Sequence, residues 1–284
     1  MAPADVLTAA SGAHAARVSD PARPAHMARA GWAGPGALRS LRGGGAGYVA
    51  VALRDGGYLE LPGGWLLVAP ARSPVGPLSL LADALPDRPF AGGERAVIDR
   101  DALVVGSVRI DLSGARGLAA PELPPRAAGA ERALDAALAE RPCALPDLDE
   151  GLGALRAGDH ARAVRALAGR GPGLTPAGDD VLAGYAAWRH AEGGEPVLGD
   201  TAAGHSSPLG LAYLRCAERG ELPQVAERVL YAVRAGDPSA AARNARALDR
   251  WGATSGTALL WGLAAGVRGA PIAGTAPAPT MRPR

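Results

Sequence analysis

Short apolar runs separated by turn residues fill the first half of the chain. Between Gly43 and Leu118 the runs YVAVAL, YLEL and WLLVAP are divided by RDGG and PGG, and SVRIDL alternates apolar and polar positions. Short runs bounded by Gly, Pro and Asp predict strands joined by hairpins. We therefore expect a β-rich domain over residues 31–125, built as a barrel-like or antiparallel sheet.

The hydrophobic period changes after the proline-rich segment 120–129. Leu134 and Leu138 lie four residues apart, and the segments that follow Asp159 and Asp237 repeat apolar positions at helical spacing behind a capping aspartate. The pattern predicts an α+β protein in which the β-rich domain is followed by an all-helical domain. The expected divisions are a flexible N-terminal segment at 1–30, the helical domain at 126–270 and a disordered tail at 271–284.

The stretch GPGLTPAGDD, residues 171–180, stands directly before the apolar run VLAGYAAW. Thr175 and Pro176 are a good N-cap and first-turn pair, and Asp179 and Asp180 favour the positive end of a helix dipole. A cap alone needs neither three glycines nor a second carboxylate, and each glycine in a helix costs about 0.5–1 kcal/mol relative to alanine. Such a local cost is typical of a functional site.

A second helix start echoes the first. GDDVLAGYAA from Gly178 aligns without gaps on GTALLWGLAA from Gly256, which pairs Gly184 with Gly262. These paired glycines could simply let two helices pack closely. Open helix starts also expose unpaired N–H groups that suit phosphate or carboxylate. We expect the two starts to meet in space and to form one anion site.

Composition excludes several classes of function. The formal net charge is +2, and all 30 basic residues counted as Lys or Arg are scattered arginines, which predicts neither a nucleic-acid partner nor a membrane surface. Without lysine there is no Walker-type phosphate loop and no lysine Schiff base. Cys143 and Cys216 form neither a metal-knuckle spacing nor a disulfide framework. The longest apolar stretch, 253–267, is shorter than the roughly 20 residues of a membrane span. We expect a cytoplasmic protein.

Three motifs resemble known sites but lack an essential feature. The glycines of RGGGAG precede a strand, whereas a dinucleotide fingerprint joins a strand to a helix. GHSSPLG has Pro208 where a nucleophile elbow needs glycine, so Ser206 or Ser207 is interpreted as the cap of the following helix. Asp179 and Asp180 could hold Mg²⁺, but neighbours on a helix point about 100° apart, so a further ligand is needed.

Three segments carry a resemblance to a known family: GRGPGLTPAGDDVLAGY, HSSPLGLAYLRCAERGELPQV and WGATSGTALLWGLAAG. Together they resemble the AllH-type subunit family of oxamate carbamoyltransferase, long catalogued as a domain of unknown function. The resemblance implies a multisubunit enzyme of allantoin breakdown that exchanges a carbamoyl group between oxalurate and phosphate, giving oxamate and carbamoyl phosphate. The Ser-Thr-Arg-Thr-Arg phosphate loop of other transcarbamylases is absent from this sequence, so a different site is required.

Both substrates are anions, which joins the resemblance to the predicted anion site. Asp179, Asp180 and Thr175 are the candidate catalytic residues, since either carboxylate could orient an amide nitrogen or position a metal. The candidate substrate-binding residues are Arg170, Gly171, Gly173, Gly178, Ser206, Ser207, Thr254, Ser255, Gly256 and Thr257.

Three hypotheses follow from these candidates. The first is a carbamoyltransferase subunit that binds small anions and acts with other subunits of a complex. The second is a noncatalytic assembly or ligand-sensing subunit of such a complex. The third is a metal-dependent hydrolase built on the two aspartates.

Overall fold

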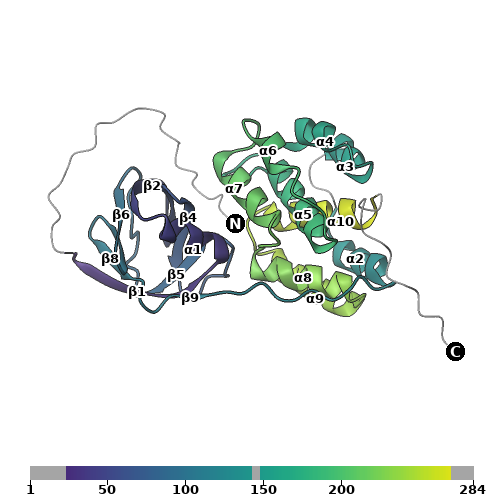
Figure 1. Cartoon of the computed structure of the whole chain (residues 1–284). Coiled ribbons are helices and arrows are strands. Elements are labelled where there is room, and N and C mark those ends of the chain that lie inside the picture. The colour runs from purple at the N-terminus through teal and green to yellow at the C-terminus, as the bar shows by residue number, and fades with distance from the viewer. Residues whose placement is uncertain (1–23, 143–147, 270–284) are drawn as a thin grey trace.

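The structure is a computed structural model that describes residues 24–142 and 148–269. An N-terminal mixed β-barrel is followed by a helical region, and an extended segment joins the two (Figure 1). The predicted α+β class is confirmed, and of the two sheet forms expected the barrel is the one observed. Residues 1–23, Cys143 and the expected tail 271–284 lie outside the described residues.

The barrel is made of eight strands with a ninth, two-residue strand at its rim. Pairing follows the order β5-β4-β3-β2-β6-β7-β8-β1, and a further β5–β1 pairing closes the ring. The pairs β4–β5 and β1–β8 are parallel and the others within the ring are antiparallel, so the sheet is mixed. The strands are β1 (His26–Ala33), β2 (Gly45–Leu53), β3 (Gly56–Leu61), β4 (Gly64–Pro70), β5 (Ser79–Asp83), β6 (Arg95–Asp99), β7 (Ala102–Val105), β8 (Val108–Asp111) and β9 (Arg116–Gly117).

Strand β1 overlaps the segment 1–30 that the sequence predicts to be flexible, and helix α1 (Pro35–Arg42) follows it. Residues 26–30 of this segment lie inside β1. The inward positions of this strand are the small residues Ala28, Ala30 and Ala33, so its hydrophobic signal is weak. Pairing with both β5 and β8 holds the strand in place.

The described part of the C-terminal region is helical, as predicted. Ser207, Asp159 and Asp237 cap their helices as the sequence indicates, accepting hydrogen bonds from Gly210, Arg162 and Ala240 respectively. None of the helices in the described ranges is long and apolar enough to cross a bilayer. The helices are α2 (Ala130–Leu138), α3 (Asp149–Arg156), α4 (His160–Leu167), α5 (Ala177–Ala191), α6 (Gly199–Ala202), α7 (Pro208–Ala217), α8 (Gln224–Arg234), α9 (Pro238–Leu248) and α10 (Ser255–Val267).

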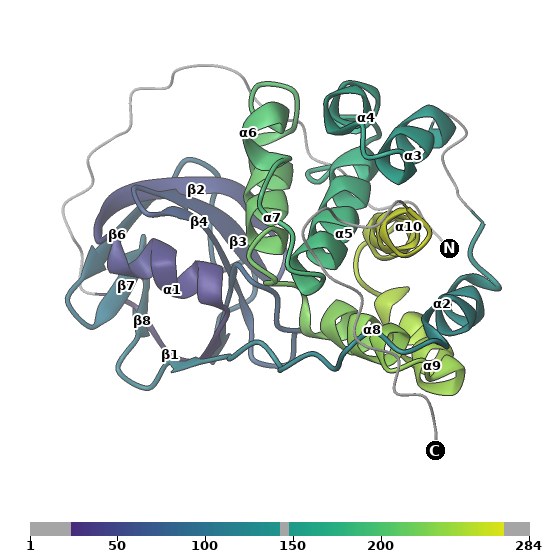
Figure 2. The same ribbon diagram turned by 45° about the vertical axis from the view of Figure 1, so that its right-hand side comes forward.

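Helices α5 and α10 form the centre of the helical region and lie side by side (Figure 2). They touch at backbone distance, because a Cβ added at Gly184 would lie 2.0 Å from the carbonyl oxygen of Leu259, and one added at Gly262 would lie 2.0 Å from that of Val181. The two contacts relate residues at equivalent places in the aligned repeats. The echo in the sequence therefore corresponds to a pseudo-symmetric helix pair.

Helix α7 lies on the side of the helical region that faces the barrel (Figures 1 and 2). Leu78 of the barrel region packs there with Leu209 and Cys216. The Arg39 guanidinium in α1 forms an ion pair with Glu221, and the N–H of Gln224 donates to the carbonyl of Val75 at 3.0 Å. These contacts dock the two parts of the chain along one shared face.

Candidate functional site

A cavity of about 260 Å³ lies where the barrel meets the starts of α5 and α10. Its walls come from both parts of the chain, and apolar side chains such as Leu67 and Leu259 alternate with polar ones. A concave site at a domain boundary with a few convergent polar groups is the usual form of a small-molecule site. Its polar wall residues are Tyr58, Thr175, Asp180, Tyr213, Glu221, Arg250, Trp251 and Ser255.

Asp180 is the most perturbed carboxyl on the cavity wall. Its side chain is buried, with 8% of the residue exposed, and its Oδ2 atom has no hydrogen-bond partner among the described residues. Burial raises the pKa of Asp180 to about 7; a hydrogen bond with Ser255 opposes the rise and the charge of Asp179 adds to it. A carboxyl with a pKa near neutrality exists in both protonation states at cellular pH, which suits proton transfer.

The two helix starts meet, as the sequence predicts. The Thr175 and Ser255 hydroxyl oxygens lie 3.3 Å apart, one from each start, and both residues line the cavity with Asp180. Thr175 is not the cap that the sequence indicated. The N-cap position of α5 is Pro176, and α5 begins one residue later, so the threonine hydroxyl is left to face α10. Because α5 begins at Ala177, Thr175 does not cap the helix, and its hydroxyl lies at the cavity.

The expectation of open backbone donors is wrong for several N–H groups at these starts. The N–H of Gly178 donates to the carbonyl of Arg170 at 2.9 Å, and the equivalent N–H of Gly256 donates to that of Trp251 at 3.1 Å. The N–H groups of Asp179 and Asp180 both donate to the Pro176 carbonyl. The preceding loops therefore fold back on the helix starts, and side chains rather than these N–H groups supply the polar contacts of the cavity.

Asp179 is not on the cavity wall, and its carboxylate is bound at the start of α7. Its carboxylate accepts hydrogen bonds from the N–H of Gly169 at 2.8 Å and from the N–H and hydroxyl of Ser207 at 3.1 and 3.3 Å. Only 1% of the residue is exposed. The carboxylate thus ties the glycine-rich loop to α7.

The remaining substrate-binding candidates do not line the cavity, and two glycines among them shape the loop before α5. Gly171 and Gly173 have φ values of 107° and 104°, in the left-handed region that glycine tolerates. A Cβ at Gly178 would lie 1.8 Å from the Leu167 carbonyl oxygen. The other candidates outside the cavity wall are Arg170, Ser206, Ser207, Thr254, Gly256 and Thr257.

Two tyrosines that no sequence pattern indicates complete the cavity. Tyr58 of β3 and Tyr213 of α7 bring their hydroxyl oxygens within 3.3 Å of each other across the boundary between barrel and helices. Burial raises the pKa of both, so both hydroxyls stay protonated. No motif in the sequence links them, because they lie 155 residues apart. The positions of Arg250 and Trp251 on the wall could have been predicted from the sequence, because both residues directly precede the GATSG segment of the second helix start.

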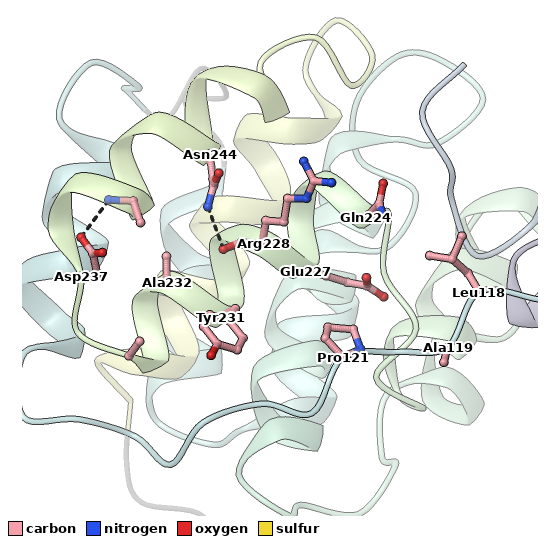
Figure 3. Close-up of a pocket in the computed structure, with 12 residues that line it drawn as sticks. Leu118, Ala119, Pro121, Gln224, Glu227, Arg228, Tyr231, Ala232, Asp237 and Asn244 are labelled. Atoms are coloured by element: carbon pink, nitrogen blue, oxygen red, sulfur yellow. Dashed lines mark hydrogen bonds between the residues drawn. The ribbon is translucent and has the colours of Figure 1, made fainter. Parts of the chain in front are cut away.

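The candidate residues gather neither in a metal centre nor in the hollow beside α8 and α9. Within the described ranges, no three His, Cys, Asp or Glu side chains are placed to hold a metal ion. A hollow of about 340 Å³ lies between the joining segment and α8–α9, with Pro121 opposite Glu227 and Tyr231 (Figure 3). Its wall holds none of the candidate site residues. The cavity at Asp180 is the one that brings candidates together.

Comparison with known proteins finds a family model that matches part of the chain. Residues 167–267 match a family model described as oxamate carbamoyltransferase subunit AllH. No curated protein and no solved structure matches the chain. The matched range begins at the end of α4 and ends with α10, so it contains both helix starts and excludes the barrel. The resemblance seen in the sequence is thereby confirmed over this range.

Proposed function

We propose, from the match over residues 167–267, that the chain is a subunit of a cytoplasmic carbamoyltransferase-type enzyme and that the cavity at Asp180 is its substrate site. The proposed reaction converts oxalurate and phosphate into oxamate and carbamoyl phosphate. Both substrates are small enough for a cavity of about 260 Å³, and both are anions. Arg250 supplies a positive charge on the wall, and the hydroxyls of Thr175 and Ser255 supply hydrogen bonds.

One observation carries the assignment of the site. Asp180 is buried at the junction of the two helix starts, and its unpartnered Oδ2 belongs to a residue on the cavity wall. A buried polar atom without a partner is costly to the fold, so its retention calls for a functional explanation. A substrate amide or a transferred proton would satisfy this atom.

The chemistry assigns Asp180 a proton-transfer role. A phosphate oxygen attacks the carbamoyl carbon of oxalurate, the bond from that carbon to the amide nitrogen breaks, and the nitrogen gains a proton as oxamate leaves. Protonated Asp180 donates this proton and then takes one from the attacking hydrogen phosphate, so the carboxyl returns to its starting state. A pKa of about 7 allows both steps near neutral pH.

In the same proposal Asp179 acts as a positioning residue. Its three hydrogen bonds hold the loop before α5 against the start of α7, which carries Tyr213. Tyr58 and Tyr213 then close the cavity from the barrel side and offer hydroxyl donors to a substrate oxygen.

The test is to co-express the chain with the products of neighbouring genes and to measure phosphate-dependent release of carbamoyl phosphate from oxalurate. We expect Asp180→Asn to lower kcat by a hundredfold or more, since general acid–base groups contribute about 10²–10⁴. Asp149→Asn, at an exposed position at the start of α3, is the matched control and should leave turnover unchanged. Absence of carbamoyl phosphate from every combination of subunits would refute the reaction.

A noncatalytic assembly or ligand-sensing role is the alternative, and the word subunit in the family description is what favours it. Calorimetric titration of the chain with oxamate and with phosphate separates the two roles when it is read beside the turnover assay. Binding that Arg250→Gln weakens, combined with turnover that Asp180→Asn does not change, would assign the cavity to sensing.

A further inference from the structure

Three arginines line a second cavity between the barrel and the helical region. This cavity, of about 390 Å³, lies between α1, the β3–β4 turn and α7. Arg39 comes from α1, Arg215 from α7, and Arg219 from the turn that follows α7. Their side chains are 37%, 47% and 46% exposed, so a ligand from solvent can reach all three.

The arginines carry more positive charge than their carboxylate partners balance. Glu221, with 10% of its side chain exposed, forms ion pairs with Arg39 and, at 3.6 Å, with Arg219. Arg215 lies 3.6 Å from Asp200, whose side chain is fully exposed, so solvent screens this pair. Within the described residues, the three guanidinium groups thus have two carboxylate partners, and only one of these, Glu221, is buried.

Two of the guanidinium groups also face a weak hydrogen-bond acceptor. A terminal nitrogen of Arg39 lies 3.7 Å from the Cys216 sulfur, and one of Arg219 lies 3.8 Å from the same atom. Burial raises the pKa of Cys216 to about 12, so the thiol is neutral and adds no negative charge. An oxyanion would be a much stronger acceptor for these donors.

We propose that this arginine cavity is a binding site for an oxyanion of the phosphate type, which competes with Glu221 for Arg39 and Arg219. Arg215 and Arg219 are four residues apart and lie on the same wall, while Arg39 approaches from the barrel. Planar guanidinium groups bind two oxygens of a phosphate at once, which suits a site with three of them. The proposal does not depend on the reaction proposed for the cavity at Asp180.

Glu221 links this site to the other cavity, because the same residue lines the wall that contains Asp180. An anion that draws Arg39 and Arg219 away leaves the Glu221 carboxylate less neutralised. The arginine cavity therefore has a direct electrostatic route to the first cavity, through one shared side chain.

The experiment is calorimetric titration of the full chain with inorganic phosphate at low ionic strength, where screening is weak. We expect saturable binding that Arg215→Gln and Arg219→Gln each weaken about tenfold, the loss typical of one charge-assisted hydrogen bond. Glu221→Gln should tighten binding, because it removes the competing carboxylate. Arg54→Gln, at an exposed arginine of the barrel, is the matched control and should have no effect.

The outcomes separate this site from the cavity at Asp180. Arg215→Gln leaves the Arg39–Glu221 ion pair intact, so it tests the site without breaking the contact between barrel and helices. Phosphate binding that is lost in Arg250→Gln but unchanged in Arg215→Gln and Arg219→Gln would place the anion in the other cavity and overturn the proposal. Absence of phosphate binding, or weaker binding by folded Glu221→Gln, would overturn it as well.

Discussion

Replacing Asp180 by asparagine should stabilise the protein at alkaline pH while it removes the proposed proton-transfer group. The pKa of this carboxyl rises from 3.8 to about 7 on folding. Ionisation is therefore less favourable in the folded chain than in the unfolded one, and stability falls as the pH rises through this window. The amide is close to the carboxyl in shape but never ionises.

The magnitude follows from the shift. About three pKa units at 1.36 kcal/mol each give a cost of ~4 kcal/mol above pH 7, and the cost disappears below the unfolded-state value of 3.8. Between pH 5 and pH 8 the cost grows by ~2.6 kcal/mol, because the folded carboxyl is only half ionised at pH 7. The advantage of Asp180→Asn over the wild type should grow by this amount across the same interval and then level off.

Urea unfolding at pH 5 and pH 8 measures this difference directly. Asp149→Asn is again the matched control, because its side chain is exposed, and its effect on the free energy of unfolding should be the same at both pH values. A difference between Asp180→Asn and wild type that does not change with pH would show that Asp180 is ionised without penalty. It would remove the physical basis of its assigned role in proton transfer.

Three further substitutions test the packing around the site. Gly184→Ala should destabilise the chain by about 1–3 kcal/mol, because its Cβ would meet the α10 backbone, whereas Gly153→Ala, in open space on α3, should be neutral or slightly stabilising in the same urea titration. Arg141→Gln should cost about 3 kcal/mol by thermal or urea unfolding, since it removes a guanidinium that is 7% exposed from its pair with Asp249; an unchanged midpoint would refute this. Asp179→Asn should lower stability by about 1–3 kcal/mol and speed proteolysis in the loop before α5, because an amide cannot accept all of the existing hydrogen bonds; equal cleavage rates would contradict the positioning role.

The sequence predicts the α+β class, several helix caps and the meeting of the two helix starts, because each depends on local patterns. Asp159 and Asp237 show the capping pattern within a few residues, and the repeat at Gly178 and Gly256 can be aligned by eye. By contrast, β1 depends on its partners in the barrel, and its small alanines give no clear strand signal.

The site was predicted only in part, for a similar reason. Thr175, Asp180 and Ser255 lie on the cavity wall as expected. Tyr58 reaches the wall only because the barrel docks on α7, and no local pattern encodes that contact. The sequence also does not predict that the loop folds back on Gly178, because this contact is made by the main-chain carbonyl of Arg170 and not by a side chain.

The pseudo-symmetric contact between α5 and α10 determines which part of the cavity can adjust to a ligand. Gly184 and Gly262 bring the two helix backbones into contact within two turns of the helix starts. This main-chain contact holds α5 and α10 together and so fixes the distance between Thr175 and Ser255. Close-packed protein interiors transmit strain and do not absorb it. The floor of the cavity is thus a rigid template, and any widening for a larger ligand has to come from the barrel wall that carries Tyr58.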